Sequence, residues 1–229
     1  MENKLSEARE MKKRYVVMTA VLLVTLWAAA VQASLLVNGS FEDTTIATPV
    51  YNGMSLYSGS TTMPGWEVKT ALSNPGAEIA WIGANGWGLT ASVGTYFLDL
   101  TGFGNTTPFA GVQQSISTVS GGHYTLTFEL GSSNQWGTPS AITATAGSTS
   151  TTFTGANLLS DNIWEPFTMN FTASGSTTTI SFMGSTGLYY IGLDNVSVNA
   201  VPLPPTVLLL GSGLAGLGLV RFRRREKKA

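Results

Sequence analysis

The chain has 229 residues, a formal net charge of −1 and no cysteine, so it offers neither disulfide bonds nor a thiolate for catalysis or zinc binding. Eleven of its twelve Lys and Arg residues lie before residue 15 or after residue 220, which leaves Lys69 as the only one between Ser34 and Ala200. Nine acidic residues in that segment bring its net charge to −8, which argues against nucleic acid as a partner.

Residues 1–33 have the pattern of a secretory signal peptide. Met11 and the three basic residues after it precede an apolar run from Tyr15 to Ala30. Val31–Ala33 then provides the small residues that signal peptidase requires at its cleavage site. We therefore predict that Met11 is the true start and that the mature chain begins at Ser34. An uncleaved N-terminal membrane anchor is the alternative.

Residues 34–200 alternate hydrophobic and polar side chains with the two-residue period of β-strands, and Gly, Asn and Pro mark the turns. The clearest run spans 123–130, and its inward positions are Tyr124, Leu126, Phe128 and Leu130. The same period recurs at 96–100, 112–116, 167–173 and 180–182. Residues 143–145 and 148–154 have strand propensity but little to bury. No sustained helical period interrupts the segment, so we predict an antiparallel β-sandwich.

The last expected strand changes its register along its length. Ile191 and Leu193 set one phase of the alternation, whereas Val196 and Val198 set the other. A change of phase requires an extra residue in the strand, so we expect a bulge or bend at 194–195.

Residues 201–229 combine a proline-rich break, an apolar run and a basic end. The apolar run 206–220 is expected to form a transmembrane helix, although at about 1.5 Å per residue it is short for a bilayer core of roughly 30 Å. The arginines and lysines that follow can extend toward the membrane surface; the arginines are Arg221, Arg223, Arg224 and Arg225. With the mature domain outside the cell, these charges lie inside. The alternative is a hydrophobic C-terminal helix packed in a soluble core.

This tail closely resembles the PEP-CTERM sorting signal of bacterial envelope proteins. The resemblance covers 201–228 and includes a sorting motif made of Val201, Pro202, Leu203 and Pro204. It implies that a membrane protease-transpeptidase, exosortase, cleaves near the prolines. The protein would then pass from the inner membrane to the cell surface or extracellular matrix of a Gram-negative-type bacterium. Leu203 replaces the usual glutamate of Pro-Glu-Pro, which leaves open whether the tail is cleaved or stays as an anchor.

Motifs along residues 35–198 resemble galactose-binding-like jelly-roll modules. They are Leu36–Glu42, Pro64–Trp66, Leu98–Gly102, Val112–Ile116, Gly122–Phe128 and Gly192–Val198, in that family's order. The resemblance implies a jelly-roll β-sandwich. Many relatives are carbohydrate-binding modules, although the group as a whole is mostly of unknown activity.

The same resemblance implies a structural calcium site. In carbohydrate-binding relatives, the glutamate of the opening motif and the aspartate near the end of the last strand share Ca²⁺, and these positions are Glu42 and Asp194 here. Backbone carbonyls would complete the shell of hard oxygen ligands that calcium requires. The alternative is that both carboxylates accept hydrogen bonds from backbone amides.

Two tryptophans in loop-like segments suggest a sugar-binding platform. Trp87 and Trp136 lie close to Asn85 and Asn134, so indole rings that stack on a pyranose would have amide partners for its hydroxyl groups. The alternative is that both rings cap the ends of the core. The remaining core candidates are Trp66, Trp81 and Trp164, because each borders a strand with apolar neighbours.

No residue pattern nominates a catalytic site. His123 is the single histidine, and no Gly-x-Ser-x-Gly motif accompanies it. A carboxylate pair for glycoside hydrolysis is the remaining enzymatic alternative, but nothing in the sequence selects the pair. We therefore expect a non-catalytic module associated with exopolysaccharide. A structural matrix protein without a specific ligand is the competing hypothesis.

Overall fold

The computed structural model describes residues 33–43, 52–83, 86–137, 139–155 and 162–202. Its contacts divide the chain into two units, Met1–Ala33 and Ser34–Ala229, and the account below concerns the second. The described residues include no helix that is long and apolar enough to cross a membrane. Residues 1–32 of the expected signal peptide, the run 206–220, the basic cluster, and Leu203 and Pro204 of the sorting motif all lie outside the described residues.

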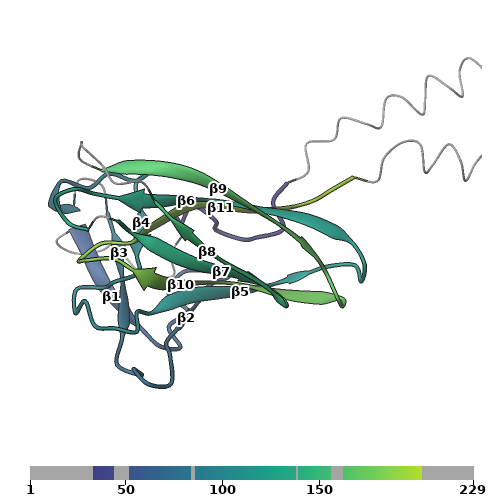
Figure 1. Cartoon of the computed structure of the whole chain (residues 1–229), viewed down its shortest axis with the longest axis horizontal. Helices are drawn as coiled ribbons and strands as arrows, with labels where there is room; N and C mark the ends of the chain where they lie inside the picture. Colours follow the sequence, from purple (N-terminus) through teal and green to yellow (C-terminus); the bar gives the residue numbers. More distant parts are fainter. Residues whose placement is uncertain (1–32, 44–51, 84–85, 138, 156–161, 203–229) are drawn as a thin grey trace, which may run out of the picture. The chain divides into compact units, whose positions relative to one another are not determined.

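Two antiparallel sheets make up the domain, as Figure 1 shows. The order in the six-stranded sheet is β1 (Gly53–Tyr57), β3 (Glu78–Ile82), β4 (Phe97–Asp99), β11 (Gly192–Ala200), β6 (His123–Ser132) and β9 (Ile163–Thr172). The order in the five-stranded sheet is β2 (Glu67–Lys69), β5 (Gly111–Ser117), β10 (Thr177–Thr186), β7 (Ala141–Ala146) and β8 (Thr149–Thr154). This architecture confirms the predicted antiparallel jelly-roll sandwich.

The main core lies between the sheets and is lined by the alternating residues that the sequence indicates. The four inward residues of β6 are all buried, as are Trp66 and Trp81. Phe128 of β6 packs edge-on against Phe182 of β10, with ring centroids 5.0 Å apart, so these rings join the two sheets. Burying one such side chain stabilises the fold by about 1.5–3 kcal/mol.

Strand β7 differs from the expectation that it has little to bury. Ile142, Ala144 and Ala146 are buried in the main core, because β7 lies inside the sheet between β10 and β8. The expectation holds for β8, whose residues are mostly exposed at the edge of the same sheet. Alternation of small alanines with threonines is a weak hydrophobic signal, so only the position in the sheet reveals that β7 is central.

The predicted irregularity in β11 is confirmed. The register between β11 and β6 shifts between Asp194 and Ser197, and Asn195 has a left-handed backbone with φ of 50°. The extra residue lets Val196 and Val198 face the core, although Leu193 precedes them in the other phase. Asp194 therefore lies on the outer face of the sheet, directly before the bulge.

A second apolar cluster lies on the outer face of the six-stranded sheet. It consists of Ala80, Ile82, Leu89, Phe97 and Tyr190, and the tryptophans Trp136 and Trp164 pack against it. Side chains alternate along a strand, so these residues of β3 and β4 point away from the main core. Trp164, expected in the core, belongs to this outer cluster. The outer face is thus covered, which a simple sandwich with one buried face per sheet does not predict.

The ends of the domain lie together at one end of β11. Ser34 Oγ accepts hydrogen bonds from the Leu36 and Val198 N–H groups, and the Val201 N–H donates to the His123 carbonyl. Gly192, at the opposite end of this nine-residue strand, pairs with Asp99. At about 3.3 Å per residue, the two ends of β11 are roughly 27 Å apart.

Candidate functional site

The outer cluster is covered by residues 86–96, here called the covering loop, which lead from near the end of β3 to β4. Its centre is held at Thr90, whose carbonyl accepts hydrogen bonds from Trp164 Nε1 (2.9 Å) and Asn162 Nδ2 (3.1 Å). Asp194 holds the next turn, because its Oδ2 accepts from the N–H groups of Ser92 and Val93 at 2.9 and 3.0 Å. Side chains from β9 and β11, far away in the sequence, therefore position this loop.

Glu42 and Asp194, the residues expected to share calcium, both bind the covering loop. Glu42 Oε1 accepts hydrogen bonds from the N–H groups of Thr95 (2.8 Å) and Tyr96 (2.7 Å). Asp194 Oδ1 accepts from Asn195 N–H at 2.7 Å. Burial raises the pKa of Asp194 to about 7 against three backbone hydrogen bonds that lower it, and the negative charge of Glu42 adds to the rise.

These contacts bear on the choice between the calcium hypothesis and its alternative. Both carboxylates face backbone N–H groups, which are donors that a cation cannot use as ligands. Among the described residues, no three His, Asp or Glu side chains are close enough together to hold a metal ion. The described hydrogen bonds are those of the amide-bonded alternative, and a calcium site of two carboxylates and backbone carbonyls at Glu42 and Asp194 stays a prediction that chelation can test.

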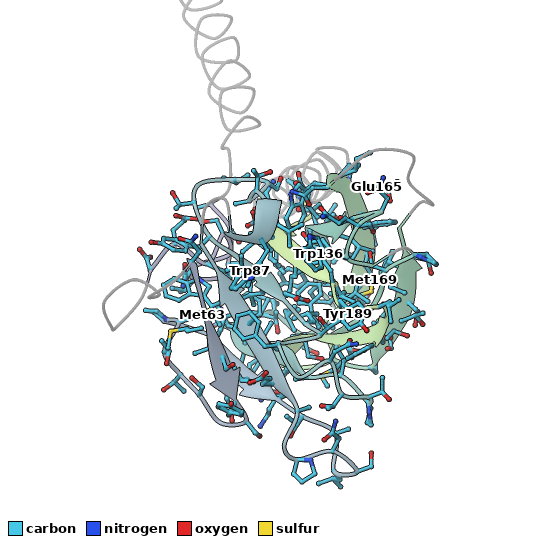
Figure 2. All side chains as sticks on the ribbon, turned by 90° about the vertical axis from the view of Figure 1, so that its left-hand side faces the viewer. Met63, Trp87, Trp136, Glu165, Met169 and Tyr189 are labelled. Atoms are coloured by element: carbon cyan, nitrogen blue, oxygen red, sulfur yellow. The ribbon has the colours of Figure 1, made fainter. Side chains whose placement is uncertain are left out.

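A pocket of about 180 Å³ opens beside the covering loop. Its rim carries exposed aromatic side chains, with 48% of Trp87, 48% of Phe103 and 58% of Tyr189 accessible to solvent. Ile82, Leu89 and Asp99 line it as well and are buried, so they form its floor. Gly102 and Trp136 complete the lining. Figure 2 views the molecule from this end and shows Trp87, Trp136 and Tyr189 close to one another.

The rim aromatics are positioned by close packing and by strained backbone. The Trp87 and Phe103 rings are 5.2 Å apart, and both lie over Gly53 of β1, where a Cβ atom would come within 2.9 Å of the indole. Trp136 Nε1 donates to the Trp87 carbonyl at 3.2 Å. Trp87 and Tyr189 have left-handed backbones, with φ of 51° and 69°. Such residues cost on the order of 1 kcal/mol or more, so the surrounding packing must hold them in place.

Asp99 on the pocket floor has one oxygen with a structural role and one without. Its Oδ1 accepts three hydrogen bonds, from Thr101 N–H (3.0 Å), Thr101 Oγ1 (2.9 Å) and Ile191 N–H (3.0 Å). No hydrogen bond from a described residue reaches Oδ2. Burial raises the pKa of Asp99 to about 7, although these three hydrogen bonds act in the opposite direction.

The neighbours of Asp99 on the sheet are small. Asp99 pairs with Ala80 on β3 and with Gly192 on β11, so the flanking side chains are a methyl group and a hydrogen. A side chain at Gly192 would collide with the Tyr190 ring, which packs over that glycine. The small residues therefore let Tyr190 and the pocket occupy the outer face of the sheet.

The structure brings together two of the four residues predicted for sugar binding. Trp87 and Trp136 line one pocket, Asn134 is exposed and does not line it, and Asn85 lies outside the described residues. The other six lining residues were not predicted, and the three that matter for the site are Phe103, Tyr189 and Asp99. Phe103 had a usable signal, because it stands between two glycines in the same way as Trp87. No sequence signal marks Asp99, because its position in the pocket depends on how the strands pair.

The pocket provides one carboxylate, that of Asp99, from the described residues. Glycoside hydrolysis generally uses two carboxylates on either side of the scissile bond. His123 is exposed at the start of β6, where its Nδ1 lies 3.0 Å from Thr172 Oγ1, and it does not line the pocket. A pocket with one carboxylate and several aromatic side chains suits ligand binding better than acid–base chemistry.

Comparison with known proteins identifies the family. The family model described as "Protein of unknown function (DUF642)" matches residues 34–198. The chain belongs to the DUF642 family. No curated protein matches the sequence.

Two solved structures are similar to this DUF642 chain. One is TmCBM61 in complex with beta-1,4-galactotriose, which is 14% identical to this chain and has a TM-score of 0.45. The match covers 74% of this chain and 100% of the solved structure. Family 16 Carbohydrate Binding Module-2 is 17% identical to this chain, with a TM-score of 0.43. The match covers 72% of this chain and 99% of the solved structure. Likeness at this level carries no information on what the present chain binds.

Proposed function

We propose that this DUF642 protein is an exported module that binds carbohydrate at the pocket beside the covering loop. The observation that carries the proposal is the exposed rim of Trp87, Phe103 and Tyr189 above a buried carboxylate. Aromatic rings stack on the apolar C–H faces of sugar rings, and a few polar groups in such a pocket orient the ligand.

The pocket lies far from the point where the tail leaves the domain, so an anchored tail would leave it accessible. The pocket includes Asp99, which pairs with the first residue of β11, whereas Val201 follows the last residue of that strand. A tail attached after Val201 thus leaves the domain roughly 27 Å away from the pocket. Exopolysaccharide of the surface or matrix is the ligand source that we propose.

We propose that the tail is a PEP-CTERM-type sorting signal handled by an exosortase after signal peptidase has removed residues 1–33. The sequence of the tail, with Pro202-Leu203-Pro204 before the run 206–220, supports this. The intact mass of the protein recovered from cells tests it. A C-terminus near Pro204 is expected for a cleaved protein, whereas a C-terminus at Ala229 would show that the tail remains as an anchor.

Binding to a panel of bacterial exopolysaccharides and oligosaccharides tests the carbohydrate function. Trp87→Gly removes the indole and at the same time relieves the left-handed backbone, so we expect an unchanged melting temperature and an affinity at least about tenfold lower. Tyr57→Ala is the matched control, because Tyr57 is 58% exposed and does not line the pocket.

Equal loss of affinity in Trp87→Gly and Tyr57→Ala would mean that the pocket is not the binding site. Failure of the intact protein to bind any glycan in the panel would leave the structural matrix protein as the better hypothesis.

A further inference from the structure

We propose that the pocket selects one uncharged sugar ring through Asp99, whose free Oδ2 accepts a hydroxyl hydrogen bond, and that it rejects acidic sugars. The inference rests on the proposed carbohydrate function and names the ligand class for that same pocket. It is carried by the hydrogen-bond pattern of Asp99, by the charges of the domain and by the pocket volume.

The hydrogen-bond pattern gives Asp99 a free acceptor on the pocket floor. All three protein donors converge on Oδ1, and Asp99 lines the pocket although only 6% of the residue is exposed. Of the described side chains, only Glu78 and Asn199 have a fully buried oxygen without a partner, so Asp99 Oδ2 is open to the pocket, where a ligand's donor can bind it in place of solvent. A sugar hydroxyl is such a donor, and a hydrogen bond to a charged group is stronger than one between neutral groups.

The charge distribution disfavours acidic ligands when Asp99 is ionised. Lys69 is the only Lys or Arg between Ser34 and Ala200, and its Nζ forms an ion pair with Glu67 Oε1 at 3.0 Å on β2, in the other sheet. A uronate or sulfated sugar in the pocket would meet Asp99 without any cation to balance the two charges. Like charges in a partly desolvated site repel strongly, so uncharged sugars are favoured.

The volume limits how much of a polysaccharide enters. An apolar protein cavity of roughly 150 Å³ holds one benzene ring, so a pocket of about 180 Å³ accommodates about one six-membered ring. The rest of the chain extends over the exposed aromatics. The geometry thus suits a terminal or branching sugar rather than a long internal segment.

Asp99→Asn isolates the proposed contact. The asparagine carbonyl oxygen can take the place of Oδ1 and keep all three structural hydrogen bonds, while the side-chain NH₂ replaces Oδ2 and becomes a donor toward the pocket. Asp43→Asn is the matched control, because it makes the same chemical change at an exposed residue that does not line the pocket.

The experiment measures the affinity of the full-length protein for matched neutral and acidic polymers, galactan against polygalacturonate and unsubstituted xylan against glucuronoxylan. Titrations are run at pH 8 so that Asp99 is ionised, with chelator to prevent metal bridging and with a detergent that has no sugar headgroup. We expect the neutral member of a pair to bind at least about tenfold more tightly, and Asp99→Asn to lower that affinity at least about tenfold while discrimination against the acidic member shrinks.

The outcomes separate the inference from the function on which it rests. If Trp87→Gly abolishes binding but Asp99→Asn binds as the parent does, or the acidic polymers bind equally well, the role of Asp99 is overturned and the carbohydrate function stands. If no polymer binds, or Trp87→Gly binds normally, the carbohydrate function itself fails and the inference fails with it.

Discussion

Asp99 and Asp194 lie on the outer face of the same sheet, on the neighbouring strands β4 and β11, and they use their carboxylates differently. Both are buried, and burial raises the pKa of each to about 7. Asp194 has hydrogen bonds from backbone amides on both oxygens, whereas the three hydrogen bonds of Asp99 all reach Oδ1. A fully bonded carboxylate holds the fold together, and one with a free oxygen beside a pocket is available to a ligand.

The two aspartates also act on different parts of the site. Asp194 holds Ser92 and Val93 of the covering loop, and that loop carries Trp87 to the pocket rim. Asp99 lines the floor itself. Loss of Asp194 should therefore affect stability first and binding only through the loop, while a change at Asp99 should affect binding and leave stability intact.

The largest expected effect is a fall in stability as the pH rises. The two carboxyl groups have a pKa of about 7 in the folded protein against 3.8 in the unfolded chain, so the folded state holds protons that the unfolded state has released. Their contribution is greatest below about pH 4 and is lost as the pH rises through about 7. For Asp99 the difference is on the order of 4 kcal/mol. Denaturant unfolding at fixed ionic strength from pH 4 to 8 measures this difference.

Substitutions of single carboxyl residues show which of them cause this pH dependence. Asp99→Asn should flatten the curve and raise stability at pH 8, because it removes a buried charge while keeping the hydrogen bonds at its Oδ1 position. Glu67, whose pKa the hydrogen bond from Lys69 lowers, works weakly in the opposite direction, so Glu67→Gln should leave the curve nearly unchanged. A stability that increases from pH 5 to 8 would contradict the proposed origin.

The same substitution at the two aspartates should give opposite results. In Asp194→Asn the side-chain NH₂ must face a backbone N–H whichever way the amide is turned, because both oxygens of Asp194 accept from backbone N–H groups. We expect a loss of about 2–4 kcal/mol in the free energy of unfolding at pH 8. Asp99→Asn should be more stable than the parent protein at pH 8, because the amide oxygen keeps the three hydrogen bonds while the buried charge is removed.

Guanidinium unfolding of both variants beside the parent protein makes this comparison directly. Hydrogen exchange at Ser92 and Val93 adds a local readout, since faster exchange is expected in Asp194→Asn alone. Equal destabilisation by the two variants would show that the hydrogen-bond patterns of the two carboxylates do not differ in the way described.

The smallest expected effect is that of a chelator. The amide donors around Glu42 and Asp194 lead us to expect a melting temperature that changes by less than about 2 °C. Calcium at a hundredfold excess over its dissociation constant would stabilise by about 2.7 kcal/mol, which corresponds to roughly 5–10 °C in a domain of this size. A fall of that size on chelation, absent in Glu42→Gln, would establish the calcium site and reassign both carboxylates as ligands.

Much of the fold was predictable because the pleat of a strand imposes a period of two residues. The inward positions of β6 and the bulge after Asp194 follow directly from that period. The burial of β7 could not be predicted, because small alanines give only a weak hydrophobic signal. The order of strands in the sheet is what makes β7 central.

The candidate site was predictable only where a residue type carries its own signal. A tryptophan next to glycine in a turn is conspicuous, so Trp87 and Trp136 could be selected as a pair. Asn134 stands beside Trp136 in the chain yet does not line the pocket. Proximity in the sequence does not determine which way a loop side chain points.

The sequence alone determined the properties that depend on composition and on local periodicity. These are the segregated charges, the terminal apolar segments, the absence of cysteine and the alternating strands. Tertiary structure decided which loop covers the outer face and which carboxylate keeps a free oxygen. The reason is that Asp99 and Asp194 differ in their long-range donors, the Ile191 N–H for one and the N–H groups of the covering loop for the other. Such contacts between distant segments exist only once the strands have paired.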